Sequence, residues 1–246
     1  MSGWKTRWWF CGLIGCLCCG IILYGTIKRT GTEVEVCSES TEKQEEAKGQ
    51  GGKEPEGAKE QEAKKIALTF DDGPHPVYTK QMLEVLEEAQ VPATFFLLGQ
   101  NIEGHEELVK EIAEKGHLIG NHTFHHVQIT GLAKEKAREE IEETSRLIEE
   151  LTGKGTEYVR PPFGTWNEGL ESNLDLIPVM WTIDTLDWTT QNVDSIVEHV
   201  VKNAGENDII LMHDSYKSTV QATERIISLL KAEGFEFVTV DEVLFD

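Results

Sequence analysis

Short apolar runs alternate with longer amphipathic stretches from residue 65 through residue 246. The runs are rich in β-branched and aromatic residues and have the length of buried strands. The longer stretches repeat apolar residues three and four positions apart, as helices do, and several end in glycine. Such alternation predicts a parallel sheet covered by helices. The expected strands are residues 66–70, 93–98, 117–122, 157–160, 178–184, 208–213 and 235–240.

The number of expected strands limits the choice of fold. Seven strands are fewer than the eight of a complete (β/α) barrel, which takes about 250 residues. We therefore expect a deformed (β/α) barrel of about seven parallel strands with outer helices. An open, doubly wound α/β sheet is the alternative.

Residues 1–30 differ from the rest of the chain. No charged side chain lies between Arg7 and Lys28, and this uncharged stretch has about the twenty residues that a membrane-spanning helix needs. Aromatic residues at both ends suit a membrane interface. We expect an uncleaved anchor in the cell membrane, with the rest of the protein extracytoplasmic. A cleavable signal is the alternative, giving a secreted protein or, because residues 13–16 resemble a lipobox, a lipoprotein.

The next segment, residues 31–63, is rich in Glu, Lys, Gln, Gly and Ser and has almost no large apolar residue. It predicts a flexible acidic linker, followed by a catalytic domain at residues 64–246. All five cysteines precede residue 38, so this domain has neither a disulfide nor a thiolate ligand. The net charge of -21 argues against a nucleic-acid partner.

Ionisable residues gather at the C-terminal ends of five expected strands. Sites of barrel and open α/β proteins are built at this end of the sheet. A solvated surface would scatter such groups, so the clustering predicts a functional site. The residues, in strand order, are Asp71 and Asp72, then His122, His125 and His126, then Arg160, then Asp184 and Asp187, and last His213 and Asp214.

Three of these residues predict a metal site. Asp72, His122 and His126 form an N/O ligand set that suits a divalent transition metal and leaves positions open for water and substrate. Zn²⁺ is our first expectation, with Co²⁺, Ni²⁺ or Mn²⁺ as alternatives. Asp71 adjoins the expected metal and is the candidate general base, whereas we expect His125 to be a bystander.

Five motifs in this order resemble the polysaccharide deacetylases of carbohydrate esterase family 4, the NodB-homology domain. They are TFDDGP at 69–74, HTFHH at 122–126, RPPFG at 160–164, DTLDW at 184–188 and LMH at 211–213. The resemblance covers the whole of residues 64–246. It implies a deformed (β/α) barrel and a metal-dependent hydrolase that removes N-acetyl groups from the amino sugars of a glycan.

The resemblance also implies a role for each matching residue. Asp72, His122 and His126 would bind the metal, with Asp71 as the catalytic base. The remaining roles are Arg160 as the partner of Asp71, His213 as the general acid, Asp184 as the residue that orients His213, Trp188 and Leu211 as the walls of the acetyl-methyl pocket, and the backbone N–H of Phe163 as an oxyanion donor.

An anchored glycan hydrolase outside the membrane points to the cell wall. We expect the substrate to be N-acetylglucosamine in bacterial peptidoglycan, acted on by a monomeric catalytic domain. Chitin-like oligomers, exopolysaccharide or acetyl-xylan are alternative substrates. A glycan-binding module that has lost its activity is a remote alternative, disfavoured by the complete set of ligands, base and acid.

Overall fold

The structure is a computed structural model that describes residues 63–166 and 174–245. The predicted anchor, and all of the predicted linker except residue 63, lie outside the described residues. Among the described residues, no helix is both long enough and apolar enough to cross a membrane.

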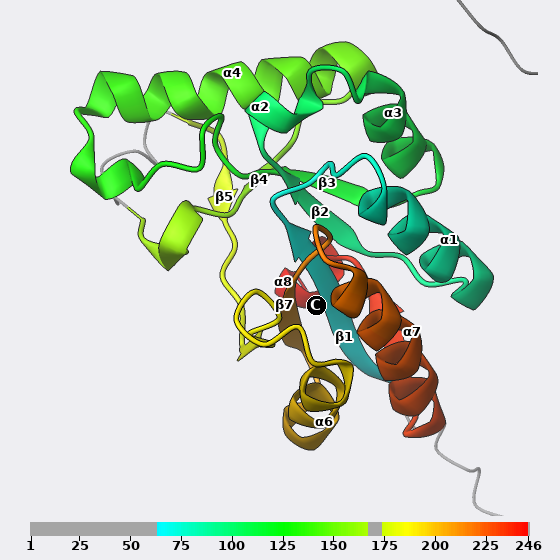
Figure 1. The fold of residues 1–246 in the computed structure, drawn as a ribbon. Coiled ribbons are helices and arrows are strands. Elements are labelled where there is room, and N and C mark those ends of the chain that lie inside the picture. The colour runs from blue at the N-terminus through cyan, green and yellow to red at the C-terminus, as the bar shows by residue number, and fades with distance from the viewer. Residues whose placement is uncertain (1–62, 167–173, 246) are drawn as a thin grey trace, which may run out of the picture. The chain divides into compact units, whose positions relative to one another are not determined.

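Eight strands and their connecting helices make up the described part of the chain (Figure 1). The strands are β1 (Lys64–Asp71), β2 (Thr94–Leu97), β3 (Leu118–Asn121), β4 (Tyr158–Val159), β5 (Ile177–Pro178), β6 (Ile183–Asp184), β7 (Asp208–His213) and β8 (Phe235–Val238). The α-helices are α1 (Tyr78–Ala89), α2 (Gly99–Ile102), α3 (Glu106–Glu114), α4 (Lys134–Thr152), α6 (Val193–Asn203), α7 (Lys217–Ala232) and α8 (Val240–Leu244). Two 3₁₀ turns, η1 (Ile129–Gly131) and η2 (Pro162–Gly164), lie in the connections.

Every strand pair in the sheet is parallel, as the alternation of strands and helices predicts. The strand order is β5-β4-β3-β2-β1-β7-β6, and β8 pairs with β1 outside this path. Strand β7 runs along β1 from the Ile66–Asp208 pair to the Asp71–His213 pair. Strand β8 pairs with the first half of β1, and β2 pairs with the second half. β1 is therefore the central strand of the sheet.

The expected strand at 178–184 is wrong, because two short strands replace it. β5 and β6 stand at opposite ends of the strand order. Only residues 179–182 separate them, and at about 3.3–3.6 Å per residue this connection spans less than about 20 Å. The two ends of the sheet must therefore curl toward each other, which confirms a deformed barrel over an open sheet.

The outer face of the curled sheet packs against helices. Alternate residues of a strand point to opposite faces. Ile66, Leu68 and Phe70 of β1 lie in the main core, together with Phe95 and Leu97 of β2. The apolar faces of α1, α3, α6 and α7 contribute most of the remaining core residues, and Figure 1 shows α1 and α7 side by side along β1.

The inner face is smaller and carries polar residues. Ala67 of β1 packs there against Phe96 of β2 and Tyr158 of β4. Thr69 and Asp71 have the same parity as Ala67, so their side chains point to the inner face too. Both are buried. A single strand thus presents apolar residues to the helices and a carboxylate to the interior.

The inner face is tightly packed around Gly120 on β3. A β carbon at this position would lie 2.3 Å from Cδ1 of Phe96, whose ring in turn contacts the guanidinium of Arg160 at 4.2 Å. We predict that Gly120→Ala lowers the free energy of unfolding by about 1–3 kcal/mol through overpacking, measured by urea denaturation. Gly131→Ala is the matched control, since nothing lies within 4 Å of its β carbon. Equal stability of the two variants would contradict the prediction.

Candidate active site

The polar residues that end the strands meet on the inner face of the sheet. Asp71 follows the inner residues of β1. Arg160 follows β4 with the parity of Tyr158, and His213 ends β7 with the parity of Ile209, both members of the inner apolar cluster. Strand parity thus gives these side chains a common direction, and the contacts below confirm that they converge.

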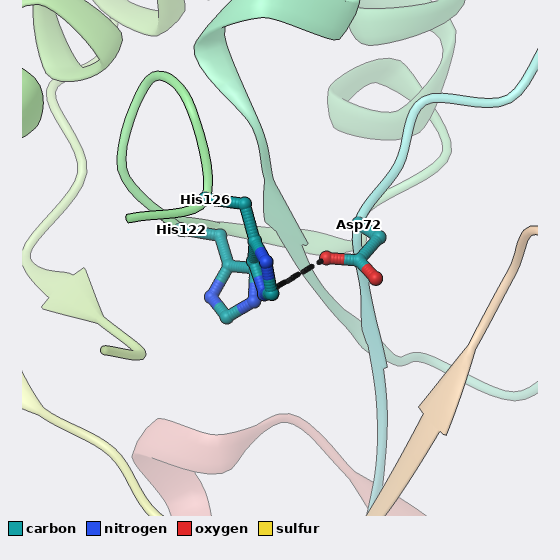
Figure 2. A group of neighbouring side chains, drawn as sticks. All are labelled: Asp72, His122 and His126. Atoms are coloured by element: carbon teal, nitrogen blue, oxygen red, sulfur yellow. Dashed lines mark ion pairs between the residues drawn. The ribbon is translucent and has the colours of Figure 1, made fainter. Parts of the chain in front are cut away.

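The predicted metal ligands lie together, as Figure 2 shows. Asp72 comes from the turn after β1, and the two histidines come from the loop after β3. Asp72 Oδ1 lies 3.5 Å from Nε2 of His122 and 3.5 Å from Nε2 of His126. All three ligand atoms lie within 4.8 Å of one another. The loops after β1 and β3, two strands separated by β2 in the sheet, therefore supply an N/N/O set of metal-ligating atoms.

Two contacts show that this cluster fits a cation. Asp72 Oδ1 is buried and has no hydrogen-bond partner among the described residues, an unsatisfied state that a bound cation would relieve. His122 Nδ1 lies 2.6 Å from the carbonyl oxygen of Arg160. A proton on Nδ1 donates to that carbonyl, which leaves Nε2 free as a metal ligand. Burial lowers the pKa of His126, which favours the neutral imidazole that binds metals.

The histidine loop is held in an uncommon backbone conformation. Thr123 and His126 have φ values of 67° and 56°, and positive φ is infrequent outside glycine. Asn121 Oδ1 accepts a hydrogen bond from the Thr123 amide, and Glu140 of α4 accepts from the amides of Phe124 and His125. These contacts fix the backbone conformation that turns both histidine side chains toward Asp72.

Asp71 is paired with Arg160, as predicted. The guanidinium donates to Asp71 Oδ1 at 2.8 Å and to Thr69 Oγ1 at 2.6 Å. It also donates to the carbonyl oxygens of Val179 and Met180. The second carboxylate oxygen, Asp71 Oδ2, lies 3.7 Å from His122 Nε2. Arg160 therefore holds one oxygen of Asp71 and leaves the other directed at the ligand cluster.

Asp187, not Asp184, orients His213. Asp187 Oδ1 lies 2.8 Å from His213 Nδ1, and its Oδ2 accepts hydrogen bonds from the His213 amide and from Thr219 Oγ1 of α7. The Asp184 carboxylate accepts instead from the Leu186 amide in the turn after β6. Leu186 in that turn has a φ of 55°. The turn reverses the chain direction and brings Asp187, the second aspartate of the motif, within hydrogen-bonding distance of the imidazole.

The surroundings of His213 favour its protonated form. Burial alone would lower the pKa of His213, but the hydrogen bond and charge of Asp187, with the charges of Asp71 and Asp72, raise it to about 9. His213 is therefore protonated at neutral pH. It is the register partner of Asp71 on the neighbouring strand β7, which places it beside the ligand cluster.

Asp214 is a buried acid that links two of the site loops. Thr79 Oγ1 of α1 donates to Asp214 Oδ2, and the His75 amide donates to the same Thr79 hydroxyl. A β carbon at Gly73 would lie 2.7 Å from Asp214 Oδ2, so only glycine fits there. Burial raises the pKa of Asp214 to about 7. This acid ties the turn that carries Asp72 to the strand that carries His213.

The predicted substrate contacts lie around the same rim. Phe163 and Trp188 are exposed, and the Phe163 ring packs against His126 with a centroid distance of 4.8 Å. Leu211 is buried on β7, two residues before His213. The predicted bystander, His125, turns away from the ligand cluster and bonds Glu140. The structure thus places one exposed aromatic ring, that of Phe163, against a predicted ligand, and Trp188 directly follows the residue that bonds His213.

Three contact residues were not foreseen from the sequence. They are Asp187 as the partner of His213, Thr69 as a partner of Arg160, and Thr219 as a donor to Asp187. Thr69 has a signal in the sequence, a hydroxyl at inward parity two residues before Asp71. No sequence pattern distinguishes Thr219 from Thr223, the other threonine of α7.

Comparison with known proteins identifies close relatives. The family model described as polysaccharide deacetylase matches residues 58–177. The chain is 39% identical over 187 residues to a peptidoglycan-N-acetylglucosamine deacetylase of Bacillus cereus, covering 73% of this chain and 87% of that protein. It is 37% identical to the Bacillus subtilis peptidoglycan-N-acetylmuramic acid deacetylase PdaC over 73% of this chain, but it spans only 38% of PdaC.

Solved structures agree with the fold. The structure of PdaC from Bacillus subtilis superposes with a TM-score of 0.72 at 36% identity, covering 74% of this chain and 91% of that chain. A CE4 family pseudoenzyme from Bacillus anthracis has a TM-score of 0.70 at 28% identity, covering 74% of this chain and 66% of that chain. Because the fold is shared with a pseudoenzyme, the individual site residues have to carry any argument about activity.

The Asp187–His213 contact generates a direct test. We predict that Asp187→Asn lowers the pKa of His213 by about 1–3 pH units, because a charged hydrogen-bond partner is removed. The measurement is an NMR titration of the His213 imidazole. Asp184→Asn is the matched control and should leave this pKa near the wild-type value. A drop in the control variant alone would restore Asp184 as the orienting residue.

Proposed function

The chain belongs to the polysaccharide deacetylase family, and from this premise we propose that it is a metal-dependent hydrolase that removes N-acetyl groups from a glycan. One observation carries the proposal. A carboxylate fixed by Arg160, a cluster of three metal-ligating side chains and a histidine paired with a buried carboxylate lie together at the carboxyl ends of the strands. A hydrolase for an amide needs a base, an electrophile and an acid in this proximity.

We assign the metal to Asp72, His122 and His126, with Zn²⁺ as the first choice. A cation held there would polarise the acetamide carbonyl and acidify a water molecule. Asp71 accepts the proton of the attacking water, since its Oδ2 faces the ligand cluster. Arg160 holds this carboxylate in place through the bond to Oδ1. The backbone N–H of Phe163 is the proposed second stabiliser of the oxyanion.

His213 supplies the proton that the leaving amine requires. An amine is a poor leaving group until it is protonated, and His213 is charged at neutral pH. The bond from its Nδ1 to Asp187 leaves Nε2 as the atom that donates. Asp187 is accordingly a positioning residue, and Leu211 and Trp188 are the proposed walls around the acetyl methyl group.

Peptidoglycan is the substrate that the relatives favour. The Bacillus cereus and Bacillus subtilis relatives carry names of peptidoglycan deacetylases acting on N-acetylglucosamine and N-acetylmuramic acid. We propose N-acetylglucosamine of peptidoglycan as the substrate of this chain, with chitin oligomers as the competing candidate.

We predict that the metal-stripped protein is inactive and that Zn²⁺ restores acetate release from purified peptidoglycan. Release is measured as acetate formed per minute, with chitin oligomers and acetyl-xylan in parallel. Acetate release from chitin oligomers alone would change the proposed substrate to chitin and leave the proposed mechanism unchanged. No acetate from any substrate despite one bound metal ion per chain would favour a binding module.

The variant Asp71→Asn distinguishes the role of the proposed base from metal binding in the same assay. The variant should bind Zn²⁺ as tightly as the wild type but lose about 10²–10⁴-fold in kcat, the usual contribution of a general base. Asp194→Asn is the control, because Asp194 is an exposed acid paired with Arg225 on the surface. Near-normal turnover of Asp71→Asn would refute the assignment of the base.

We further propose that residues 1–30 hold the protein at the outer side of the cell membrane as a monomer on a flexible tether. The uncharged N-terminal stretch and the absence of cysteine from residues 64–246 support this location. We predict that the full chain sediments with membranes, is digested by protease added to intact cells, and becomes soluble when residues 1–30 are deleted. Recovery of the full chain in the cytosol would refute the location.

A further inference from the structure

The two loops that carry the predicted metal ligands begin on strands that are not neighbours. Asp72 follows β1, His122 and His126 follow β3, and β2 lies between these strands in the sheet. Neighbouring strands lie about 4.7–4.9 Å apart, so the two loops leave the sheet roughly 10 Å apart. The three ligand atoms nevertheless lie within 4.8 Å of one another. The loops therefore have to converge over the end of β2, where the chain continues into α2.

The start of α2 binds the histidine loop. The Gly99 amide donates to the carbonyl oxygen of Thr123 at 3.0 Å. The next amide, that of Gln100, donates to the carbonyl oxygen of Phe124, also at 3.0 Å. Both carbonyl groups belong to the stretch between the two histidine ligands, so α2 holds the backbone that connects them.

The same segment also binds the turn that carries Asp72. The Leu98 amide, directly before α2, donates to the carbonyl oxygen of Gly73 at 3.0 Å. Asn101 Nδ2 donates to the carbonyl oxygen of Asp72 at 2.8 Å. Asp72 has a φ of 71°, and a non-glycine residue keeps such a conformation only where its surroundings enforce it. Each of residues 98–101 thus donates a hydrogen bond to one of the two ligand loops.

Gly99 lets α2 approach the histidine loop closely. A β carbon at Gly99 would lie 2.4 Å from Cδ2 of Phe124 and 2.5 Å from Oγ1 of Thr144 on α4. Carbon atoms in contact are normally separated by about 3.5–4.0 Å, so a larger residue fits only if the loop shifts. α2 is therefore packed against both the histidine loop and α4, and it binds the loop from a fixed position.

We propose that α2 is a bridge that sets the separation of the two ligand loops, and that Asn101 is a positioning residue for the metal site. The proposal rests on the proposed function, because it concerns the same three ligands. The ligand cluster contains none of residues 98–101, which act through the backbone of the loops that supply it. A ligand set that is already in place binds a cation more tightly, because the loops do not have to be ordered on binding.

The test measures Zn²⁺ binding by the full-length, metal-free protein, titrated in competition with a chelator of known affinity. Asn101→Ala removes the one bridging bond that comes from a side chain and leaves the three backbone bonds. It should raise the Kd for Zn²⁺ roughly 10–100-fold, the usual effect of removing an outer partner of a metal ligand. A Kd equal to the wild-type value would overturn the proposal.

Asn203→Ala is the matched control for this variant. Asn203 Nδ2 also donates to a backbone carbonyl, that of His199, at 2.7 Å, but it does so on the exposed surface of α6. The control should leave the Kd for Zn²⁺ unchanged. An equal rise of Kd in both variants would show that the effect is not specific to the bridge, and would refute the positioning role.

Two further readouts distinguish positioning from a loss of stability. Urea denaturation of the metal-free proteins gives the folded fraction under the titration conditions, and Co²⁺ bound in place of Zn²⁺ reports ligand geometry through its visible absorption. Asn101→Ala should be folded before metal is added and should give a Co²⁺ spectrum that differs from that of the wild type. A lower free energy of unfolding with wild-type Kd and wild-type Co²⁺ spectrum would leave Asn101 a structural role alone and overturn the proposal.

Gly99→Ala tests the bridge with Asn101 in place. The added β carbon pushes α2 away from Phe124, so the Kd for Zn²⁺ should rise in this variant too. Gly131→Ala is its control, since nothing lies within 4 Å of the β carbon there. Equal Kd values for these two glycine variants would show that the separation of the loops does not depend on α2.

Metal titration needs no substrate, so the bridge and the proposed function can fail separately. If the wild type binds one Zn²⁺ ion per chain but releases no acetate from any glycan, the proposed function fails, and the Kd values of the variants still decide the role of α2. If the wild type binds neither Zn²⁺ nor Co²⁺, the metal assignment and the bridge are both refuted.

Discussion

The structure depends on a buried guanidinium. Arg160 is fully buried, and a charge in that position is tolerated only with good partners. It has them on two sides of the curled sheet: Asp71 at the end of β1 and the carbonyls of Val179 and Met180 in the connection between the sheet's two ends. Phe96 adds a ring face at 4.2 Å. Removing one partner of such a buried pair costs about 3–5 kcal/mol, so the guanidinium that positions the proposed base also ties the central strand to the connection between the two ends of the sheet.

Strand parity and two tight loops explain how the site is assembled. Alternate residues of β1 point to opposite faces of the sheet. The Asp71 side chain therefore lies on the inner face, whereas Phe70 packs against the helices on the outer face. Asp72 cannot follow the same course, and its φ of 71° turns it out of the strand toward the histidine loop. Adjacent carboxylates are thereby given different neighbours, one a guanidinium and the other two imidazoles. The different roles proposed for these two residues follow from that division.

The features that were predicted correctly from the sequence depend on the periodicity of apolar residues. The features that were predicted wrongly depend on the conformation of turns. The alternation of apolar and amphipathic stretches predicted the parallel sheet, and the ionisable residues at the strand ends predicted that Asp71, Asp72, His122, His126 and His213 lie together. The single strand expected at 178–184 was wrong, because an apolar run does not reveal that its middle crosses between two ends of a sheet. The partner of His213 was misassigned for a similar reason. Asp184 and Asp187 are both aspartates of the same short motif, so the sequence does not distinguish them. The turn at Leu186 determines which carboxylate reaches the imidazole.

The central position of β1 has a consequence for how the chain folds. This strand is the first of the domain, yet it pairs along its length with β7 and β8, which are the last. Contacts between such distant segments are slow to form because a long loop has to close first. The central ladder therefore cannot form until nearly all of the domain has been synthesised, and until then the first strand has an unpaired edge. A growing chain of this topology can pair β1 with β2 early, but the β1–β7 ladder has to wait until the last segments have been made.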